Sequence, residues 1–185
     1  MNNSLFVPFN HESILKENKK RGKFTGFLFL YLLIFSLGIT IVVALQQFIV
    51  ALMLILIIWD SILIGYSIFY FNQGKYNPKN ENLLYKYDFM GDGLIVSKNS
   101  RKNIESYKIE HSCLYRPYGD KQYIAKVYES SNDLTFKLRV GSSNFIPVYR
   151  KVILPKSVLT NTEERNNLIS RLKQIFGQDY IVNNQ

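Results

Sequence analysis

The sequence predicts an α+β membrane protein, in which a two-helix transmembrane hairpin is followed by a small antiparallel β-barrel capped by a C-terminal amphipathic helix. Two apolar stretches, residues 24–45 and 48–71, lie almost back to back and contain a single charge. From about residue 84 onward, apolar and polar residues alternate, which is typical of half-buried strands. An apolar stripe with helical spacing ends just before residue 177 and predicts the capping helix.

Each apolar stretch is long enough to cross a bilayer as a helix. Residues 24–45 carry no charge, and a helix of this length spans a hydrocarbon core of about 30 Å. Gln46–Gln47 separates this stretch from residues 48–71, whose one charged residue is Asp60. Burial in the core of a soluble protein is a weaker alternative, because little chain remains to surround two such helices. A cleaved signal peptide ending near Val42–Ala44 is also disfavoured, since the apolar run is longer than the hydrophobic region of a typical signal peptide.

The charges beside the two stretches predict their orientation. The connector Gln46–Gln47 carries no charge, whereas basic residues lie before the first stretch and after the second. Because Lys and Arg are enriched on the cytosolic side of membranes, we expect both termini in the cytosol of a multi-pass plasma membrane protein. Cations beside the membrane also attract anionic lipids. The expected lipid contacts are Lys19, Lys20, Arg21 and Lys23.

Asp60 is the one charged residue within the apolar stretches. An ionised carboxylate at that depth costs about 2.5–3.5 kcal/mol on insertion scales. Folding the hairpin at its connector brings Asp60 to the depth of Leu33 and about one turn from Ser36, so Asp60 and Ser36 form the expected intramembrane polar contact. One interpretation is a hydrogen bond to Ser36, Thr40 or Ser61 that holds helices together within or between chains. The other is an ion or proton path, which needs several copies of so short a hairpin.

The two helices are expected to pack closely where their side chains are small. Gly38 in the first stretch and Gly65 in the second are the candidates, because glycine lets two helix backbones approach. No small-xxx-small repeat surrounds either glycine, so this signal is weak.

The rest of the chain divides into four segments. Residues 1–23 form a cytosolic N-terminal segment with a basic helix beside the membrane. Residues 72–83 are a polar linker that contains glycine and proline. Residues 84–177 form a cytosolic β-domain together with its C-terminal helix, and residues 178–185 form a tail.

Period-two alternation identifies the strands of the β-domain. The first strand has three aromatic residues on one face, and Gly91–Gly93 provides a tight turn into the second. The clearest strand runs from Leu134 to Val140 and alternates apolar with polar residues. Further strands are expected at 104–109, 123–128 and 145–154.

The C-terminal helix has recognisable start and stop signals. Thr160 and Glu163 have the spacing of a capping box, and Gly177 is expected to end the helix after Phe176. Six or seven short antiparallel strands with one such helix describe a small, partly open barrel that the helix plugs at one end.

The order of these parts resembles the bacterial YcxB-like membrane proteins. The resemblance rests on YDFMGDGLIVS at residues 87–97 and on Leu154-Pro155-Lys156 before the capped helix. The chain differs at Ser106-Tyr107, where such proteins often have a tryptophan that opens the third strand. The resemblance implies a pleckstrin-homology-like (PH-like) β-domain attached to the plasma membrane, with Phe6–Phe9 as an added strand. It supplies no catalytic residues.

The residues offer no pattern typical of a catalytic, metal or cofactor site. His11 and His111 lack further ligands at metal spacing, and no glycine-rich nucleotide loop is present. Cys113, the only cysteine, is expected to be a buried structural thiol in a reducing compartment. We therefore expect no enzyme activity, no metal and no cofactor.

The net charge of +9 indicates an anionic partner. Lys98, Arg101 and Lys102 cluster in one loop, and the cations expected on strands are Lys137, Arg139, Arg150 and Lys151. Anionic lipids are favoured over nucleic acid, because the basic domain lies beside a membrane in this topology and no nucleic-acid-binding signature is present. A charge excess that only aids solubility is the simplest alternative.

Three function hypotheses remain from the sequence. The leading one is a membrane-anchored, non-enzymatic binding or regulatory module that binds lipid head groups or a protein partner at the inner leaflet. The second is an oligomeric ion or solute transport component that uses Asp60, and the third is a membrane-resident immunity protein. The expected partners are the lipid bilayer, anionic lipids, and a second copy of the chain or another membrane protein.

Overall fold

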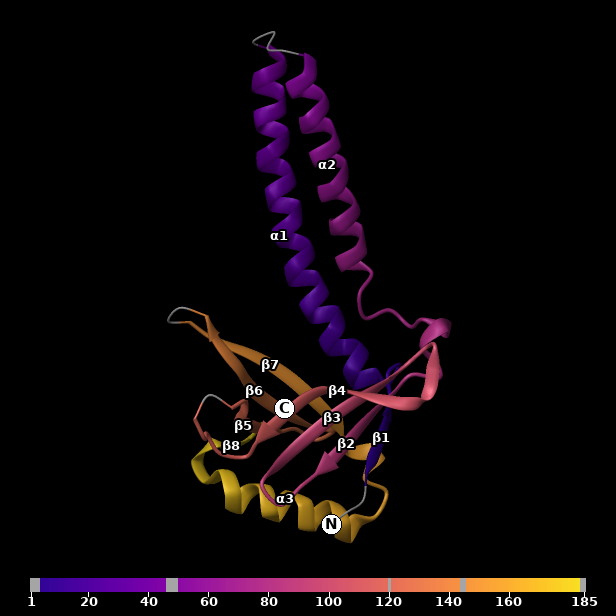
Figure 1. Cartoon of the computed structure of the whole chain (residues 1–185), viewed down its shortest axis with the longest axis vertical. Helices are drawn as coiled ribbons and strands as arrows, with labels where there is room; N and C mark the ends of the chain where they lie inside the picture. Colours follow the sequence, from indigo (N-terminus) through magenta and orange to yellow (C-terminus); the bar gives the residue numbers. More distant parts are fainter. Residues whose placement is uncertain (1–3, 46–49, 120, 144–145, 184–185) are drawn as a thin grey trace. The chain divides into compact units, whose positions relative to one another are not determined.

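The computed structural model describes residues 4–45, 50–119, 121–143 and 146–183 (Figure 1). The chain forms two compact units. The helical unit contains residues 14–76, and the sheet unit contains the residues before 14 together with those from 77 onward. The first strand therefore belongs to the sheet unit, although both helices separate it from the other strands in the sequence.

The helical unit consists of two helices, α1 (Glu12–Leu45) and α2 (Val50–Phe71), which lie side by side (Figure 1). The basic segment before the first apolar stretch and the stretch itself form one continuous helix. Both helices are long and apolar enough to cross a membrane by length and composition. The prediction of two long apolar helices is confirmed.

The two helices contact each other along a narrow seam. On both helices, buried or half-buried residues recur alternately every three and four positions, which is the spacing of a left-handed coiled coil. On α1 the seam residues are Gly22, Gly26, Phe29, Leu33, Ser36, Thr40 and Val43. On α2 they are Met53, Leu56, Asp60, Leu63, Ser67 and Tyr70.

Outside this seam, the helices expose large apolar side chains. Phe35 is 65% exposed and Trp59 is 53% exposed. In the most apolar part of each helix, only 11% of the residues in α1 and 17% in α2 are buried. The described residues therefore leave a large apolar surface on both helices uncovered.

The sheet unit is built on an eight-stranded sheet. Seven strands follow one another across the sheet in chain order: β1 (Leu5–Pro8), β2 (Leu84–Phe89), β3 (Gly93–Ser100), β4 (Asn103–Leu114), β5 (Tyr123–Glu129), β6 (Asp133–Ser143) and β7 (Ile146–Pro155). The eighth, β8 (Tyr180–Val182), pairs with β5 and lies in the segment expected to be a tail. Because β1 pairs with β2 in antiparallel register, the added N-terminal strand is confirmed.

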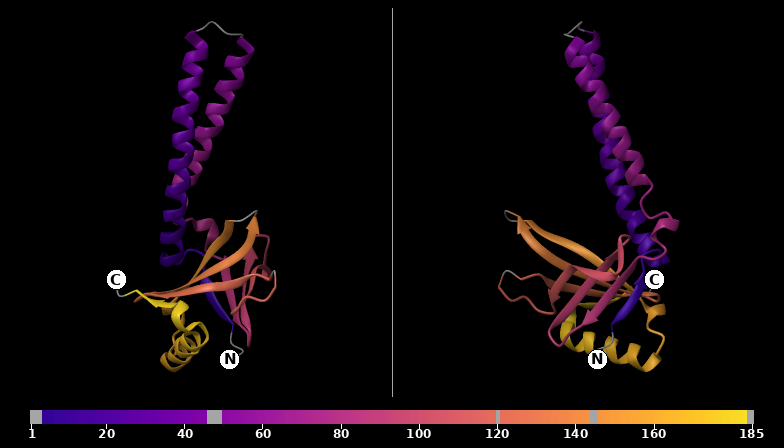
Figure 2. Two further views of the ribbon diagram at one scale, coloured as in Figure 1. Left: turned by 90° about the vertical axis from the view of Figure 1, so that its left-hand side faces the viewer. Right: turned by 45° about the vertical axis from the view of Figure 1, so that its right-hand side comes forward.

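The α+β class is confirmed, but the sheet is open and mixed and does not form the partly open antiparallel barrel that the sequence predicts. β4 and β5 run parallel where they meet, through the single pair Leu114 and Tyr123. Among the described residues, β7 pairs with neither β1 nor β4, and Figure 2 shows the β6–β7 hairpin leaving the other strands. Closing a barrel requires edge pairs between residues far apart in the chain, which the alternation within each strand does not specify.

The core of the sheet unit lies on the inner face of the sheet, where α3 (Thr162–Phe176) covers one end (Figure 1). The Tyr87 hydroxyl within this core donates a hydrogen bond to the carbonyl oxygen of Ile153 at 2.7 Å. Arg171 of α3 donates to the carbonyl oxygens of Met90 and Gly91. The largest fully buried side chains include Tyr87, Leu94, Leu134, Phe136, Leu154 and Leu172.

The start of α3 differs by one residue from the expected cap. The Asn161 side chain accepts hydrogen bonds from the backbone N–H groups of Glu163 and Glu164, so Asn161 rather than Thr160 caps the helix. The predicted stop is confirmed, because Gly177 follows the last helical residue with a φ of 51°, a conformation that favours glycine.

Candidate functional site

The inner face of the sheet changes from apolar to basic along its strands. On β3, Leu94 and Val96 belong to the core, and the next residue on the same face is Lys98. On β7, Val152 is buried and Arg150 is the next residue on its face. Lys108 of β4 pairs directly with Lys98, so both side chains lie on one face. Three strands thus place cations where the core ends.

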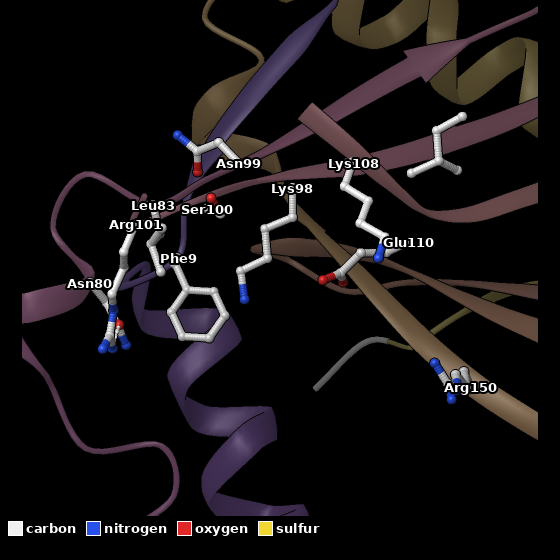
Figure 3. Close-up of a pocket in the computed structure, with 11 residues that line it drawn as sticks. Phe9, Asn80, Leu83, Lys98, Asn99, Ser100, Arg101, Lys108, Glu110 and Arg150 are labelled. Atoms are coloured by element: carbon white, nitrogen blue, oxygen red, sulfur yellow. Dashed lines mark hydrogen bonds between the residues drawn. The ribbon is translucent and has the colours of Figure 1, made fainter. Parts of the chain in front are cut away.

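These cations line a cleft of about 780 Å³ (Figure 3). Phe9, which follows β1, and Arg101, in the turn after β3, also line it, and Glu110 of β4 is its one carboxylate. We call this site the basic cleft and define it by Phe9, Lys98, Arg101, Lys108, Glu110 and Arg150.

A buried asparagine holds the turn that carries Arg101. Asn99 is 2% exposed, and its Oδ1 accepts a hydrogen bond from the backbone N–H of Leu84 at 2.7 Å. Its Nδ2 donates to the carbonyl oxygens of Asn82 at 3.0 Å and Ile104 at 3.3 Å. Asn99 thereby ties the β3–β4 turn to the segment before β2. This rim of the cleft is held by buried hydrogen bonds.

Two aromatic rings position the Lys98 ammonium. Its Nζ lies 4.0 Å from the centroid of the Phe9 ring and 5.4 Å from that of Tyr85, distances at which cation–π attraction acts. Burial lowers the pKa of Lys98 below its ordinary value; Glu110 opposes this shift and Arg101 adds to it. The ammonium is therefore partly removed from water.

The cations that line the basic cleft outnumber its carboxylates, because Glu110 is the one acidic residue in its lining. Elsewhere in the sheet unit, Lys156 lies 2.8 Å from Glu129 and Lys86 lies 3.1 Å from Asp88. Within the described part of the chain, Lys98, Lys108 and Arg150 have no ion pair of this kind. An excess of cations over carboxylates within one cleft creates a positive potential that attracts anions.

Of the three hydrogen-bond partners expected for Asp60, the structure shows Thr40. Asp60 is 6% exposed and Ser36 is 7% exposed, so both lie in the helix seam. Thr40 Oγ1 lies 3.2 Å from Asp60 Oδ2 and 3.1 Å from the Ser36 carbonyl oxygen. Side chains lean toward the N-terminus of their helix. The side chains of Asp60 and Thr40 therefore lean toward each other, and Asp60 meets Thr40 rather than Ser36.

Two buried polar atoms of α2 have no hydrogen-bond partner among the described residues. They are Asp60 Oδ1 and Ser67 Oγ. Asp60 is also the only charged residue of α2, so the seam offers its carboxylate a hydroxyl group instead of a cation. This arrangement suits a structural contact between the two helices of one chain.

The close approach of the helices occurs at other glycines than expected. A Cβ added to Gly38 or Gly65 would meet no atom within 4 Å. At Gly22 it would overlap the carbonyl oxygen of Tyr70, and at Gly26 it would lie 3.1 Å from the Phe71 ring. Gly22 and Gly26 have small-xxx-small spacing. Sequence reasoning missed this signal, because Gly22 precedes the apolar stretch.

The four expected lipid contacts lie in the first half of α1. Lys19, Lys20, Arg21 and Lys23 are all exposed. Arg21 Nε donates to Glu17 Oε1 at 3.1 Å, so one of these cations is paired within the helix. The contact of these side chains with anionic lipids stays a prediction.

Cys113 is a buried free thiol, as the sequence predicts. Burial raises its pKa to about 11, so the thiol is protonated at neutral pH and is a weak nucleophile. Its Sγ lies 3.8 Å from Gln122 Oε1. Over the residues described, no three His, Cys, Asp or Glu side chains come together in a way that could hold a metal ion.

Comparisons with known proteins found no match for this chain. No protein-family model matches the chain, and no curated protein or solved structure matches it significantly. The resemblance to the YcxB-like proteins and the PH-like fold stay predictions. The function is therefore argued from the residues of this chain alone.

Proposed function

We propose that this protein is a membrane-anchored, non-enzymatic binding module. In this proposal α1 and α2 hold the chain in a bilayer, and the sheet unit binds an anionic lipid head group in its basic cleft. The observation that carries the proposal is that Lys98, Lys108 and Arg150 line one cleft with a single carboxylate, Glu110, and that none of the three forms an ion pair among the described residues.

The uncovered apolar surface of the helices supports the anchor. Side chains such as Phe35 and Trp59 are more than half exposed, whereas a helix in the core of a soluble protein is mostly buried. Transferring these side chains from water into hydrocarbon is favourable by about 25 cal/mol per Å² of apolar surface. Basic residues flank the apolar stretches and their connector has none, which supports a cytosolic sheet unit.

The anchor also favours a lipid head group as the ligand of the basic cleft. A domain tethered to the cytosolic leaflet meets anionic lipids at a high effective concentration, so even a weak site is occupied. A protein partner with an acidic surface is the competing occupant.

A direct test compares the lipids retained by the full-length protein. In the cleft variant Lys98→Gln/Lys108→Gln/Arg150→Gln, the donors are lost. The matched control Lys121→Gln/Lys126→Gln/Arg165→Gln loses the same charge outside the cleft. After detergent washing, mass spectrometry should find anionic lipid on the wild type and the control but little on the cleft variant. Equal retention by all three proteins contradicts head-group binding in the cleft.

The anchor is tested separately from the ligand. Washing native membranes with alkaline carbonate removes peripheral proteins, whereas a helical hairpin stays in the membrane pellet. We expect the full chain to resist this treatment and to dissolve only in detergent. Recovery of the chain in the carbonate supernatant contradicts the anchor.

A second candidate function is an oligomeric transport component. It is favoured by Asp60 Oδ1, which has no hydrogen-bond partner among the described residues. In that case Asp60→Asn abolishes ion flux into proteoliposomes. If Asp60 is a structural contact, the same variant changes helix pairing and leaves the flux at the level of empty liposomes.

A further inference from the structure

We propose that the basic cleft selects a phosphomonoester, a phosphate group attached to its carrier through one oxygen, over singly charged head groups. This inference rests on the proposed binding of an anionic group in the same cleft. It adds the chemical class of the ligand and the residues that distinguish it.

The charge of the cleft favours a ligand with more than one negative charge. Lys98, Arg101, Lys108 and Arg150 face a single carboxylate, Glu110, within one cavity of about 780 Å³. A phosphodiester carries one negative charge and leaves most of this positive charge unbalanced. A phosphomonoester carries about −1.5 to −2 at pH 7, which balances more of it.

The directions of the donors favour a group with three free oxygens. Lys98 comes from β3, its register partner Lys108 comes from β4, and Arg150 comes from β7 on the other side of the cleft (Figure 3). A phosphomonoester has three terminal oxygens and can accept from three sides, whereas a diester has two. The planar Arg150 guanidinium can bind two of these oxygens together, as arginine does at other phosphate sites.

Lys98 is the donor best prepared for such a ligand. The rings of Phe9 and Tyr85 hold its ammonium, and burial of this group lowers its pKa. Charge-assisted hydrogen bonds are stronger where water is partly excluded. Leu83 and Ile109 also line the cleft and provide apolar contact for the carrier of the phosphate.

The test uses the full chain in nanodiscs of neutral phosphatidylcholine and three probes in isothermal titrations. Glycerol 3-phosphate is a soluble monoester, and glycerophosphoglycerol is the matching soluble diester. We expect the monoester to bind about tenfold more tightly or better, as one extra charge-assisted hydrogen bond provides. Dihexanoyl phosphatidic acid, the lipid monoester, distinguishes the source: tighter binding than glycerol 3-phosphate indicates a lipid ligand, and equal binding indicates a soluble one.

Variants locate the selectivity within the cleft. Lys98→Gln and Arg150→Gln should each weaken monoester binding by about tenfold and bring the two soluble probes closer in affinity. Lys98→Arg keeps the charge and should retain much of the binding. Lys121→Gln, a charge loss outside the cleft, should change neither affinity. Circular dichroism confirms that each variant folds, since Lys98 is only half-buried and Arg150 is exposed.

The protonation of the ligand provides an independent readout. The second pKa of a phosphomonoester is about 6, so at pH 5 it carries a charge close to that of a diester. Selectivity should therefore decline between pH 7.5 and pH 5. The charged and titratable groups facing Lys98 are Tyr85 from β2, Arg101 from the β3–β4 turn, Lys108 and Glu110 from β4, and Arg150 from β7.

The outcomes separate this inference from the proposed function. Equal affinity for monoester and diester, with both weakened by Lys98→Gln, overturns the selectivity and leaves anionic binding in place. Binding of neither soluble probe nor of the lipid monoester contradicts both. If Lys98→Gln and Arg150→Gln leave selective binding unchanged, the binding site lies outside the basic cleft. That result overturns the inference.

Discussion

The sheet unit and the helical unit differ in how many of their large apolar side chains they bury. In the sheet unit, Leu134, Phe136 and Leu154 are fully buried. In the helical unit, Phe35 and Trp59 are more than half exposed, while the narrow seam buries Leu33 and Leu63 together with small and polar residues such as Gly22, Ser36 and Asp60. Burial of apolar surface therefore organises the sheet. Close backbone approach at Gly22 and the Thr40–Asp60 hydrogen bond add to the apolar contacts of the helix seam, as the proposed membrane anchor predicts.

The two units also differ in how they hold a carboxylate that is half-buried in the sheet unit and buried in the helical unit. In the sheet unit, Glu129 accepts hydrogen bonds from Lys156 Nζ and from the Tyr180 hydroxyl, both at 2.8 Å, and Lys173 Nζ lies 3.5 Å away. Burial by itself raises the pKa of Glu129, but these bonds and charges outweigh burial and hold the pKa below its ordinary value. Asp60 in the helical unit bonds to the Thr40 hydroxyl. The sheet unit thus surrounds the Glu129 carboxylate with cations, whereas the seam offers the Asp60 carboxylate only a hydroxyl group.

The largest expected effect tests the difference in apolar burial. Phe136→Ala leaves a cavity in the sheet core and should destabilise the sheet unit by about 3–5 kcal/mol. Phe35→Ala removes a ring of the same size from the helix surface and should change helix pairing by less than about 1 kcal/mol, because no cavity forms. Denaturant titrations followed by circular dichroism measure both. Similar losses in the two variants contradict the comparison.

Substitutions at two glycines of α1, one in the helix seam and one outside it, test helix packing through small residues. Gly22→Val places a side chain against the backbone of Tyr70 and should weaken helix pairing by about 1–3 kcal/mol. Gly38→Val carries the same change in helix propensity but meets no atom within 4 Å, so it is the matched control. Steric trapping of the full chain in micelles reports on α1–α2 pairing. If the control is as destabilised as Gly22→Val, propensity rather than close approach explains the effect.

The charged cluster of the sheet unit predicts a pH dependence. Because the folded pKa of Glu129 is lowered, its stabilising contribution is fully present above the ordinary carboxyl pKa of about 4.3 and is lost as the pH falls through the folded value. Glu129→Gln should cost about 1.5 kcal/mol at pH 7, as for a hydrogen bond to a charged group. Melting curves of the two proteins should converge at acid pH. A constant difference at every pH argues against a contribution from the charge.

The smallest expected effect concerns Asp60 and Thr40. A double-mutant cycle with Asp60→Asn and Thr40→Val should give a coupling of about 0.6 kcal/mol, typical of hydrogen bonds between membrane helices. Steric trapping of the full chain in micelles can resolve a coupling of this size. The same cycle with Ser61 in place of Thr40 is the control, since the Ser61 hydroxyl donates to the Ile57 carbonyl oxygen of its own helix. Equal coupling in both cycles contradicts a specific Asp60–Thr40 contact.

Much of the local structure could be predicted from the sequence. The two apolar helices, the alternating strand from Leu134 and the helix that ends at Gly177 follow from residue patterns that are continuous along the chain. The β8 strand escaped prediction because three residues are too few to show a period. The seam glycine Gly22 escaped because it precedes the apolar stretch.

The sequence by itself thus determined the two apolar helices, the C-terminal helix, most of the strands and the excess of positive charge. Only the tertiary structure decided that the sheet stays open and that Lys98, Lys108 and Arg150 meet in one cleft. The physical reason is that strand periodicity is local, whereas register and the pairing of strand edges depend on contacts between residues far apart in the chain. The register of a strand therefore decides whether its cations line a cleft or point into bulk water.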